Sequence, residues 1–261
     1  MTARPIPPDG EGPGGSRDHY SYQVYADAAM ANRFDTLRFS GPIGTLLAEE
    51  QARVISTFLG DVAGRRILDV GTGTGRAAIG LAGLGADVTG VDASEEMLKV
   101  ARERAREAKV AVAFQQGYAH HLPFDDRSFD AAVSLRVLMH TPDWRTCLRE
   151  LCRVSRRRVV FDYPSAWSLA ALQAGARRVV SAVGGRTEAY RVLGRGAVAA
   201  ALASAGFRIA DEHRQFVLPI AFHKLIASRT FTTSVEGALG RVGLLGVFGT
   251  PVTVVAERCE P

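Results

Sequence analysis

The segment Arg66-Ile67-Leu68-Asp69-Val70-Gly71-Thr72-Gly73-Thr74-Gly75-Arg76 indicates the fold of this chain. A short apolar run leads into three glycines at alternate positions, and residues 77–82 predict the start of a helix. A strand, a glycine-rich turn and a helix bring the backbone close to a nucleotide-like ligand. Glycine serves there because a Cβ atom would block that approach and because the turn can require positive φ. A purely structural turn is the alternative interpretation.

A second predicted strand, residues 86–91, ends at Asp92, where a carboxylate can accept hydrogen bonds from both hydroxyls of a ribose. Two nucleotide-binding schemes share this layout, and the glycine spacing distinguishes them. The dinucleotide fingerprint G-x-G-x-x-G requires a glycine where this chain has Arg76, because its third glycine comes one residue early. Asp69 also disfavours a pyrophosphate, since like charges repel, and it suits a ligand that carries a cation.

The motif Asp69-Val70-Gly71-Thr72-Gly73-Thr74-Gly75 resembles the first motif of the class I S-adenosylmethionine-dependent methyltransferases, and Asp92 matches the ribose-binding acid of that family. The resemblance extends from Ile67 to Asp162. It implies S-adenosyl-L-methionine as the cofactor. It also implies an α/β fold: a Rossmann-like, doubly wound, seven-stranded, mostly parallel sheet with an antiparallel edge, a helical N-terminal segment and a C-terminal helical insertion.

A second segment, residues 117–124, resembles the family pattern G-D-A-x-x-L-P-F, with Tyr118 in place of the aspartate that reads the adenine amino group. Tyr118 could stack on the ring or use its hydroxyl, and the backbone of Ala119 could meet the ring edge. His120 is either a contact on the cofactor side or an exposed loop residue. Residues expected to bind the cofactor are Asp69, Gly71, Thr72, Gly73, Gly75, Asp92, Ala93, Met97, Tyr118, Ala119, His120, Leu135 and Arg136.

The catalytic base is not fixed by the sequence. His140 matches a histidine that is often present after strand four in the family, and it is the candidate, with a structural or substrate-positioning role as the alternative. His213 and His223 are expected at the surface. No metal site is expected, because His120 and its neighbour His121 have no acidic or cysteine cluster at a ligand spacing.

Three parts are expected along the chain. Residues 1–18, rich in proline and glycine, predict a disordered tail. Residues 19–60 predict a helical N-terminal cap segment. Residues 61–261 form the expected S-adenosylmethionine-binding methyltransferase domain, with helical insertions at about 164–190 and 218–245. In the cap segment, Tyr25, Arg33 and Arg38 are candidates for lining the site or for ordinary surface and packing roles.

Between Ile67 and Tyr163 the pattern predicts five strands alternating with helices, including one helix between the third and fourth strands. Right-handed crossovers place the carboxyl ends of strands one, two and four at one edge, where open α/β sheets bind ligands. Two further strands are expected near residues 207–217 and 251–256. The basic triplet Arg156-Arg157-Arg158 is interpreted as a solvated loop, with contact to an anionic substrate as the alternative.

The composition limits the classes of protein. The 261 residues are 47% hydrophobic, which excludes a disordered chain, and a net charge of +5 from scattered arginine is weak support for nucleic acid, which is not expected as a partner. Three cysteines suggest reduced thiols and a cytoplasmic location. The sequence has no signal-peptide pattern at its start and no apolar run of the ~18 residues that a membrane span needs. Contact with a membrane surface is a minor alternative, and the oligomeric state is not predicted.

The resulting functional hypothesis is a methyltransferase that transfers a methyl group to oxygen or carbon of a small-molecule acceptor. Apolar segments after Pro164 and at residues 218–226 would suit a hydrophobic acceptor, and would equally suit core packing. Two alternatives stand beside it. One is a non-catalytic cofactor-binding protein on the same fold, because a fold does not guarantee an activity. The other is an NAD-dependent oxidoreductase, which the glycine spacing and Asp69 disfavour.

Overall fold

The computed structural model describes residues 38–259 except 142, 169–170 and 172–190. Its strands are β1 (Arg66–Val70), β2 (Asp87–Asp92), β3 (Ala113–Gln116), β4 (Phe129–Ser134), β5 (Ser155–Tyr163), β6 (Phe207–Phe216) and β7 (Thr250–Arg258). Its helices are α3 (Gly41–Leu59), α4 (Arg76–Gly83), α5 (Glu95–Glu107), α6 (Trp144–Val154), α8 (Arg195–Ser204), α9 (Ile220–Ile226), α10 (Arg229–Arg241) and α11 (Leu244–Phe248).

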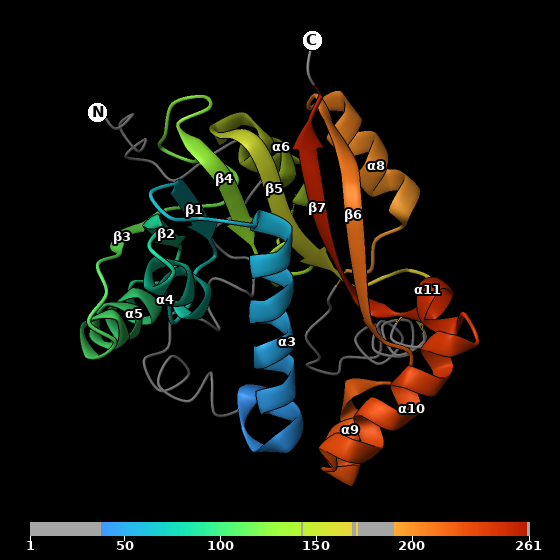
Figure 1. Ribbon diagram of the computed structural model, residues 1–261. Helices are drawn as coiled ribbons and strands as arrows, with labels where there is room; N and C mark the ends of the chain where they lie inside the picture. The colour runs from blue at the N-terminus through green and yellow to red at the C-terminus, as the bar shows by residue number, and fades with distance from the viewer. Residues whose placement is uncertain (1–37, 142, 169–170, 172–190, 260–261) are drawn as a thin grey trace, which may run out of the picture.

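The strands of this described part form one seven-stranded sheet in the order β3-β2-β1-β4-β5-β7-β6 (Figure 1). Neighbouring strands from β3 to β5 pair in parallel, while β7 lies between β5 and β6 and is antiparallel to both. The expected doubly wound, mostly parallel sheet with an antiparallel edge is confirmed. The strand order reverses between β1 and β4, which is where ligands bind in open α/β sheets.

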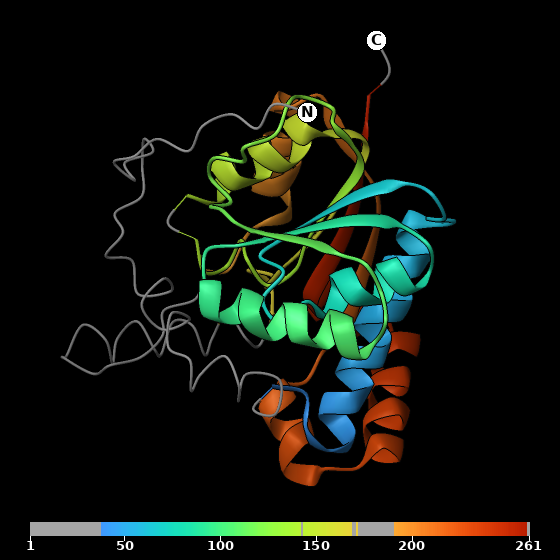
Figure 2. The same cartoon turned by 90° about the vertical axis from the view of Figure 1, so that its left-hand side faces the viewer.

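Helices cover both faces of the sheet (Figure 2). Because successive side chains of a strand point to opposite faces, the apolar residues of β1 serve two cores. Leu68 and Val70 pack with α6 and α8, whereas Ile67 packs with α3 and α4. Asp69 shares the face of Ile67 and is only 2% exposed, so β1 delivers a buried carboxylate to the α3–α4 side of the sheet.

Two local expectations are wrong. No helix connects β3 to β4; residues 117–128 form turns, with an isolated bridge between Tyr118 and His121. The basic triplet is not a loop, because α6 ends at Val154 and β5 begins at Ser155. Arg158 lies in β5 and donates from Nε to Glu257 on β7 at 3.1 Å and from Nη1 to the Phe58 carbonyl at 3.2 Å. Strand pairing and these acceptors hold the triplet in the sheet.

The C-terminal insertion is helical, as expected, and its helices α9 and α10 pack against α3 (Figure 1). Arg229 at the start of α10 donates to Glu49 of α3 at 2.5 Å. The predicted tail at 1–18 and most of the predicted insertion at 164–190 lie outside the described residues, as do Tyr25 and Arg33. Within the described part, no helix is both long enough and apolar enough to cross a bilayer.

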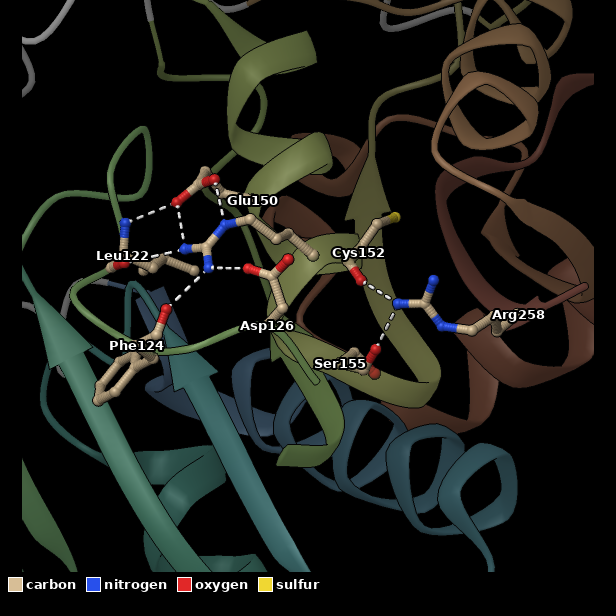
Figure 3. Close-up of polar contacts among 8 residues, drawn as sticks. Leu122, Phe124, Asp126, Glu150, Cys152, Ser155 and Arg258 are labelled. Atoms are coloured by element: carbon tan, nitrogen blue, oxygen red, sulfur yellow. Dashed lines mark hydrogen bonds and ion pairs between the residues drawn. The ribbon is translucent and has the colours of Figure 1, made fainter. Parts of the chain in front are cut away.

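Two arginines fasten α6 and the segment that follows β3 (Figure 3). Arg153 on α6 donates to the carbonyl oxygens of Leu122 and Phe124 at 3.0 and 2.7 Å, and to the carboxylates of Glu150 and Asp126 at 2.7 and 2.8 Å. At the end of β7, Arg258 donates to the carbonyl oxygens of Cys152 and Ser155 at 2.7 and 2.6 Å. Arg258 thus donates to two carbonyl oxygens at the α6–β5 junction, where the last turn of a helix has carbonyls without intrahelical partners.

Replacing Arg153 with methionine should lower the free energy of unfolding by about 2–4 kcal/mol, because Glu150, whose side chain is 15% exposed, would lose its counter-charge. Urea denaturation followed by circular dichroism measures this change. Arg106→Met is the matched control on α5, where both members of the Arg106–Glu103 pair are exposed, and it should change stability by less than about 0.5 kcal/mol. Equal effects of the two substitutions would contradict the assignment.

Candidate functional site

At the glycine turn after β1, two segments of the chain lie very close together. Gly71 has φ +71° and a Cβ at this position would collide with Val137 Cγ2 in the turn after β4. Gly75 has φ +81° and caps α4, and its Cβ would lie 3.0 Å from Ala101 Cβ and 3.1 Å from Phe114 Cζ. Gly71 therefore allows the ends of β1 and β4 to meet, and Gly75 allows α4 to pack on α5 and β3.

Two carboxylates organise this turn. Asp92, at the end of β2, accepts hydrogen bonds from the backbone N–H of Gly73 at 2.8 Å and of Ser94 at 2.9 Å. Asp69 accepts from Thr72 Oγ1 at 2.7 Å. The backbone N–H groups of Gly71 and Thr72 donate to the carbonyl of Val91 at 2.7 and 3.0 Å. The turn is thereby held between β1 and β2 with both acids in its wall.

A pocket opens at this edge of the sheet, on the carboxyl ends of β1, β2 and β4. It is lined by the turn, by the start of α5, by the segment after β3, by the turn after β4 and by the segment around α3. The lining residues are Arg38, Phe39, Gln51, Asp69, Gly71, Thr72, Gly73, Thr74, Arg76, Ala77, Asp92, Ala93, Ser94, Met97, Gly117, Ala119, His120, Leu135, Arg136, Val137, His140 and Thr141.

The sequence-predicted cofactor residues lie in this lining with two exceptions, Gly75 and Tyr118. Gly75 lies behind the turn, where its role is the packing described above. Tyr118 is bridged to His121, while its neighbours Gly117 and Ala119 line the pocket. The roles assigned to the predicted residues stay predictions; the structure gives their place.

Phe39, Gln51 and Arg76 are pocket residues that sequence reasoning did not select. The Arg76 guanidinium lies over the Phe39 ring, 3.6 Å from its centroid, and donates to Gln51. Arg76 stood out in the sequence only as the residue that breaks the dinucleotide fingerprint. Phe39 and Gln51 precede the glycine turn by twenty residues or more, and no local pattern connects them to it. Arg38, a candidate of the cap segment, lies in the same wall.

The charges of the pocket are strongly perturbed by burial. Burial raises the pKa of Asp69 to about 6, and the nearby Asp92 adds to this, while Thr72 and Arg76 act in the opposite direction. Burial also raises the pKa of Asp92, while the hydrogen bonds that it accepts from backbone N–H groups lower this pKa. Burial lowers the pKa of Arg76 to about 10, so this guanidinium stays charged at neutral pH. The pocket floor thus carries negative charge that a cationic ligand would stabilise.

Two histidines lie on the side of the pocket formed by the segments after β3 and β4. His120 Nε2 is 2.8 Å from Thr141 Oγ1, which in turn is 3.1 Å from Cys147 Sγ. His140 lines the pocket, and its backbone N–H donates to the Val137 carbonyl at 2.9 Å. His120 is therefore a partly buried wall residue and not an exposed loop residue, and His140 lines the same pocket.

A second pocket adjoins the first and shares four of its lining residues, Arg38, Phe39, Gln51 and Arg136. Its other lining residues come from α3, β5, β6, α9 and β7: Leu47, Glu50, Val54, Asp162, His213, Gln215, Ile220, Lys224, Pro251 and Thr253. Elements outside the β1–β5 unit therefore provide most of this pocket.

The surface placement expected for two histidines is wrong. His213 Nε2 lies 3.1 Å from Glu50 Oε1 inside the second pocket, and burial lowers the pKa of His213. His223 is 0% exposed; its Nε2 lies 2.8 Å from Glu236 Oε1 and its Nδ1 lies 3.1 Å from Thr232 Oγ1. His223 therefore connects α9 to α10. Among the described residues, no group of three or more His, Cys, Asp or Glu side chains could hold a metal ion.

Comparisons with known proteins agree with this site. The family model described as a methyltransferase domain matches residues 68–161. A ubiquinone biosynthesis O-methyltransferase of Alkalilimnicola ehrlichii is 43% identical over 101 residues, which are 38% of this chain and 41% of the relative. The chain spans less than half the length of the first curated relatives that it matches. Residues 68–161 therefore match a methyltransferase domain, as the resemblance in the sequence predicts.

Solved structures share the fold over most of the chain. The magnesium protoporphyrin IX methyltransferase of Synechocystis PCC 6803, solved with bound S-adenosylhomocysteine, has a TM-score of 0.65 at 18% identity, covering 90% of this chain and 97% of that one. The geranyl diphosphate C-methyltransferase of Streptomyces coelicolor A3(2) has a TM-score of 0.61 at 20% identity, covering 80% and 79%. At these identities the likeness shows the fold alone.

Replacing Asp69 with asparagine should stabilise the chain at neutral pH and leave its stability unchanged below about pH 4. An unfolded aspartate titrates near ~3.9, whereas the folded pKa of Asp69 is about 6. The folded wild type therefore binds more protons between these values and loses stability as the pH rises through them, by roughly 3 kcal/mol in total. The variant has no such proton to lose.

Urea denaturation at a series of pH values from about 4 to 8 measures this difference. The matched control is Asp87→Asn at the start of β2, where the side chain is 73% exposed, and it should change stability by less than about 0.5 kcal/mol. If Asp69→Asn increased the free energy of unfolding by the same amount at about pH 4 and at about pH 7, the raised pKa of Asp69 would be contradicted.

Proposed function

We propose that this chain is an S-adenosylmethionine-dependent methyltransferase that acts on a small molecule. The observation that carries the proposal is the pocket at the switch point of the sheet, in which Asp69, Asp92 and the glycine turn share one wall. The matches to methyltransferase domains support it. We take S-adenosyl-L-methionine as the cofactor because solved neighbours hold it or its demethylated product.

The pocket residues fit that cofactor chemically. Asp92 is a carboxylate at the end of β2, positioned to accept hydrogen bonds from ribose hydroxyls. Asp69 supplies buried negative charge, which would be stabilised by the positive charge of a sulfonium or ammonium group. Met97, Gly117 and Ala119 offer an apolar and backbone wall for a base ring. The negatively charged pyrophosphate of a dinucleotide would instead meet the carboxylate of Asp69, which disfavours NAD.

When bound, the cofactor supplies a methyl group already activated by a sulfonium centre. The protein's task is then to bind, orient and exclude water, a contribution of up to ~7–11 kcal/mol in well-oriented model reactions. The glycine turn fixes the floor of the pocket, and Arg76 with Phe39 and Gln51 closes it from the side of α3. An acceptor that must lose a proton needs a base, and the candidate imidazoles are His120 and His140 in the first pocket and His213 in the second.

The second pocket is our proposed place for the acceptor. It joins the cofactor pocket through Arg38, Phe39, Gln51 and Arg136. Its apolar side chains, Leu47, Val54, Ile220 and Pro251, would contact the body of a hydrophobic molecule. O- and C-methylation are both compatible with this arrangement.

The alternative function is a non-catalytic cofactor-binding protein, which predicts that the cofactor binds and that no methylated product forms. Incubation with labelled S-adenosylmethionine and a panel of acceptors distinguishes this alternative from a methyltransferase.

Isothermal titration calorimetry should give saturable binding of S-adenosylmethionine to wild type, and Asp92→Ala should weaken it at least about tenfold, because charge-assisted hydrogen bonds are lost. Asp130→Ala is the matched control: this carboxylate also accepts a backbone N–H, from Arg66 at 2.9 Å, but at the opposite end of the strands. The control should keep wild-type affinity. Saturable binding of NAD with no binding of S-adenosylmethionine would reverse the proposal.

A further inference from the structure

The second pocket contains an imidazole beside a carboxylate. His213 of β6 and Glu50 of α3 both line it, and His213 is the one histidine in its described lining. His120, whose Nε2 lies 2.8 Å from Thr141 Oγ1, and His140 line the cofactor pocket instead. Glu50 directly precedes Gln51, which lines both pockets. The pair of His213 and Glu50 therefore lies next to the wall that the two pockets share.

The two ring nitrogens of His213 have different surroundings. Nε2 is buried and lies 3.1 Å from Glu50 Oε1, without forming a well-aligned hydrogen bond. Nδ1 forms no hydrogen bond within the described part of the chain and is not buried, so a molecule in the pocket can reach it. Catalytic hydrogen bonds are often poorly aligned in the absence of substrate and tighten when it binds. The geometry thus leaves Nδ1 for a ligand and turns Nε2 toward the acid.

Arg53 keeps Glu50 charged. Its guanidinium donates from Nε to Glu50 Oε2 at 2.9 Å and from Nη2 to Oε1 at 2.5 Å. These hydrogen bonds lower the pKa of Glu50, against the burial that raises it, so the carboxylate is ionised at neutral pH. A negative charge beside Nε2 favours the tautomer of His213 that carries its proton on Nε2 and its lone pair on Nδ1.

The imidazole of His213 is itself neutral at neutral pH. Burial lowers its pKa and Arg53 acts in the same direction, while Glu50 and Asp211 oppose them. The other ionisable residues that line this pocket are Arg38, Arg136, Asp162 and Lys224. With a pKa below the ordinary ~6.5, His213 can accept a proton at neutral pH. A neutral ring gains little Coulomb energy from Glu50, so the contact orients the imidazole more than it stabilises the fold.

We infer that Nδ1 of His213 is the general base that takes the proton of a phenolic acceptor in the second pocket, with Glu50 and Arg53 as positioning residues. This inference rests on the proposed function and specifies its base and its acceptor class. A phenol suits this base, because a phenolic hydroxyl ionises near ~10, closer to an imidazole than an aliphatic alcohol does. The apolar residues of the pocket, such as Leu47 and Val54, would contact the aromatic ring.

The proposed step balances in protons and electrons. The O–H bond of the acceptor breaks and its proton passes to Nδ1 of His213. The acceptor oxygen forms a bond to the methyl carbon, and the electron pair of the broken C–S bond stays with sulfur. The imidazolium is stabilised by the carboxylate of Glu50 until its proton returns to solvent.

Nuclear magnetic resonance of the full chain with nitrogen-15-labelled histidine tests the geometry without cofactor or turnover. At neutral pH His213 should be the tautomer protonated on Nε2, its signals being assigned by their loss in His213→Gln. Phenol should shift the Nδ1 resonance, because its O–H donates to the lone pair, whereas anisole, which has the same ring and no O–H, should not. An Nδ1 resonance that responds to neither compound, or equally to both, would overturn the inference.

Glu50→Gln tests the positioning of the ring. Loss of the negative charge should reduce the preference for the proton on Nε2 by about tenfold, as expected for a charge-assisted contact. The matched control is Glu49→Gln, the preceding residue of α3, whose carboxylate is bound by Arg229 at 2.5 Å and lies outside both pockets. The control should keep the wild-type tautomer. An unchanged tautomer in Glu50→Gln would contradict the inferred role of Glu50.

Methyl transfer from labelled S-adenosylmethionine to phenol measures the catalytic part. His213→Gln should lower kcat at neutral pH by about a hundredfold or more, with a smaller effect on KM for phenol, because a general base acts in the transition state. The matched control His121→Gln, an exposed histidine outside both pockets, should keep the wild-type rate. Equal rates in His213→Gln and wild type, or no transfer when both phenol and cofactor are bound, would overturn the inference.

Affinity for S-adenosylmethionine separates this inference from the proposed function. Calorimetry should give the wild-type affinity for His213→Gln, because His213 does not line the cofactor pocket. A phenol response at His213 in a chain that does not bind S-adenosylmethionine would contradict the proposed function. Binding of S-adenosylmethionine without any phenol response at His213 would contradict the base and the acceptor class alone.

Discussion

The carboxylate of Asp92 holds the turn on which the site depends. It accepts the Gly73 N–H at 2.8 Å and the Ser94 N–H at 2.9 Å, and so joins the glycine turn after β1 to the start of α5. Burial opposes this ionised form by raising its pKa, and the two backbone donors compensate in part. The carboxylate that shapes the turn is thus the same one that we propose to bind the ribose hydroxyls of the cofactor.

The rest of the site is built by segments that lie outside the match to the methyltransferase domain. The family match ends at residue 161, whereas Phe39 and Gln51 of the cap segment close the cofactor pocket and Lys224 of the C-terminal insertion lines the second one. The alignments with the curated relatives cover less than half of the length of those relatives. In the function that we propose, the shared domain carries the cofactor chemistry and the additions at both ends of the chain select the acceptor.

Sequence patterns predicted much of the cofactor wall and little of the second pocket. Asp69, the glycine turn and Asp92 were found because each lies within a few residues of a strand end, and parallel strands bring those ends together. Arg156–Arg158 was interpreted wrongly, because the acceptors of Arg158 come from α3 and β7. His213 and His223 were wrongly expected at the surface, since Glu50 and Glu236 reach them from other helices.

Local periodicity predicts the doubly wound sheet, and short-range motifs predict the glycine turn with its two acids. The class of domain follows from the resemblance of those motifs to a known family. The tertiary structure alone decided which distant residues complete the site. Arg76 meets Phe39 and Gln51, and Lys224 meets Arg38, across separations that no local pattern encodes. The physical reason is that burial and charge depend on what packs alongside a residue, and packing partners are fixed only when the chain closes on itself.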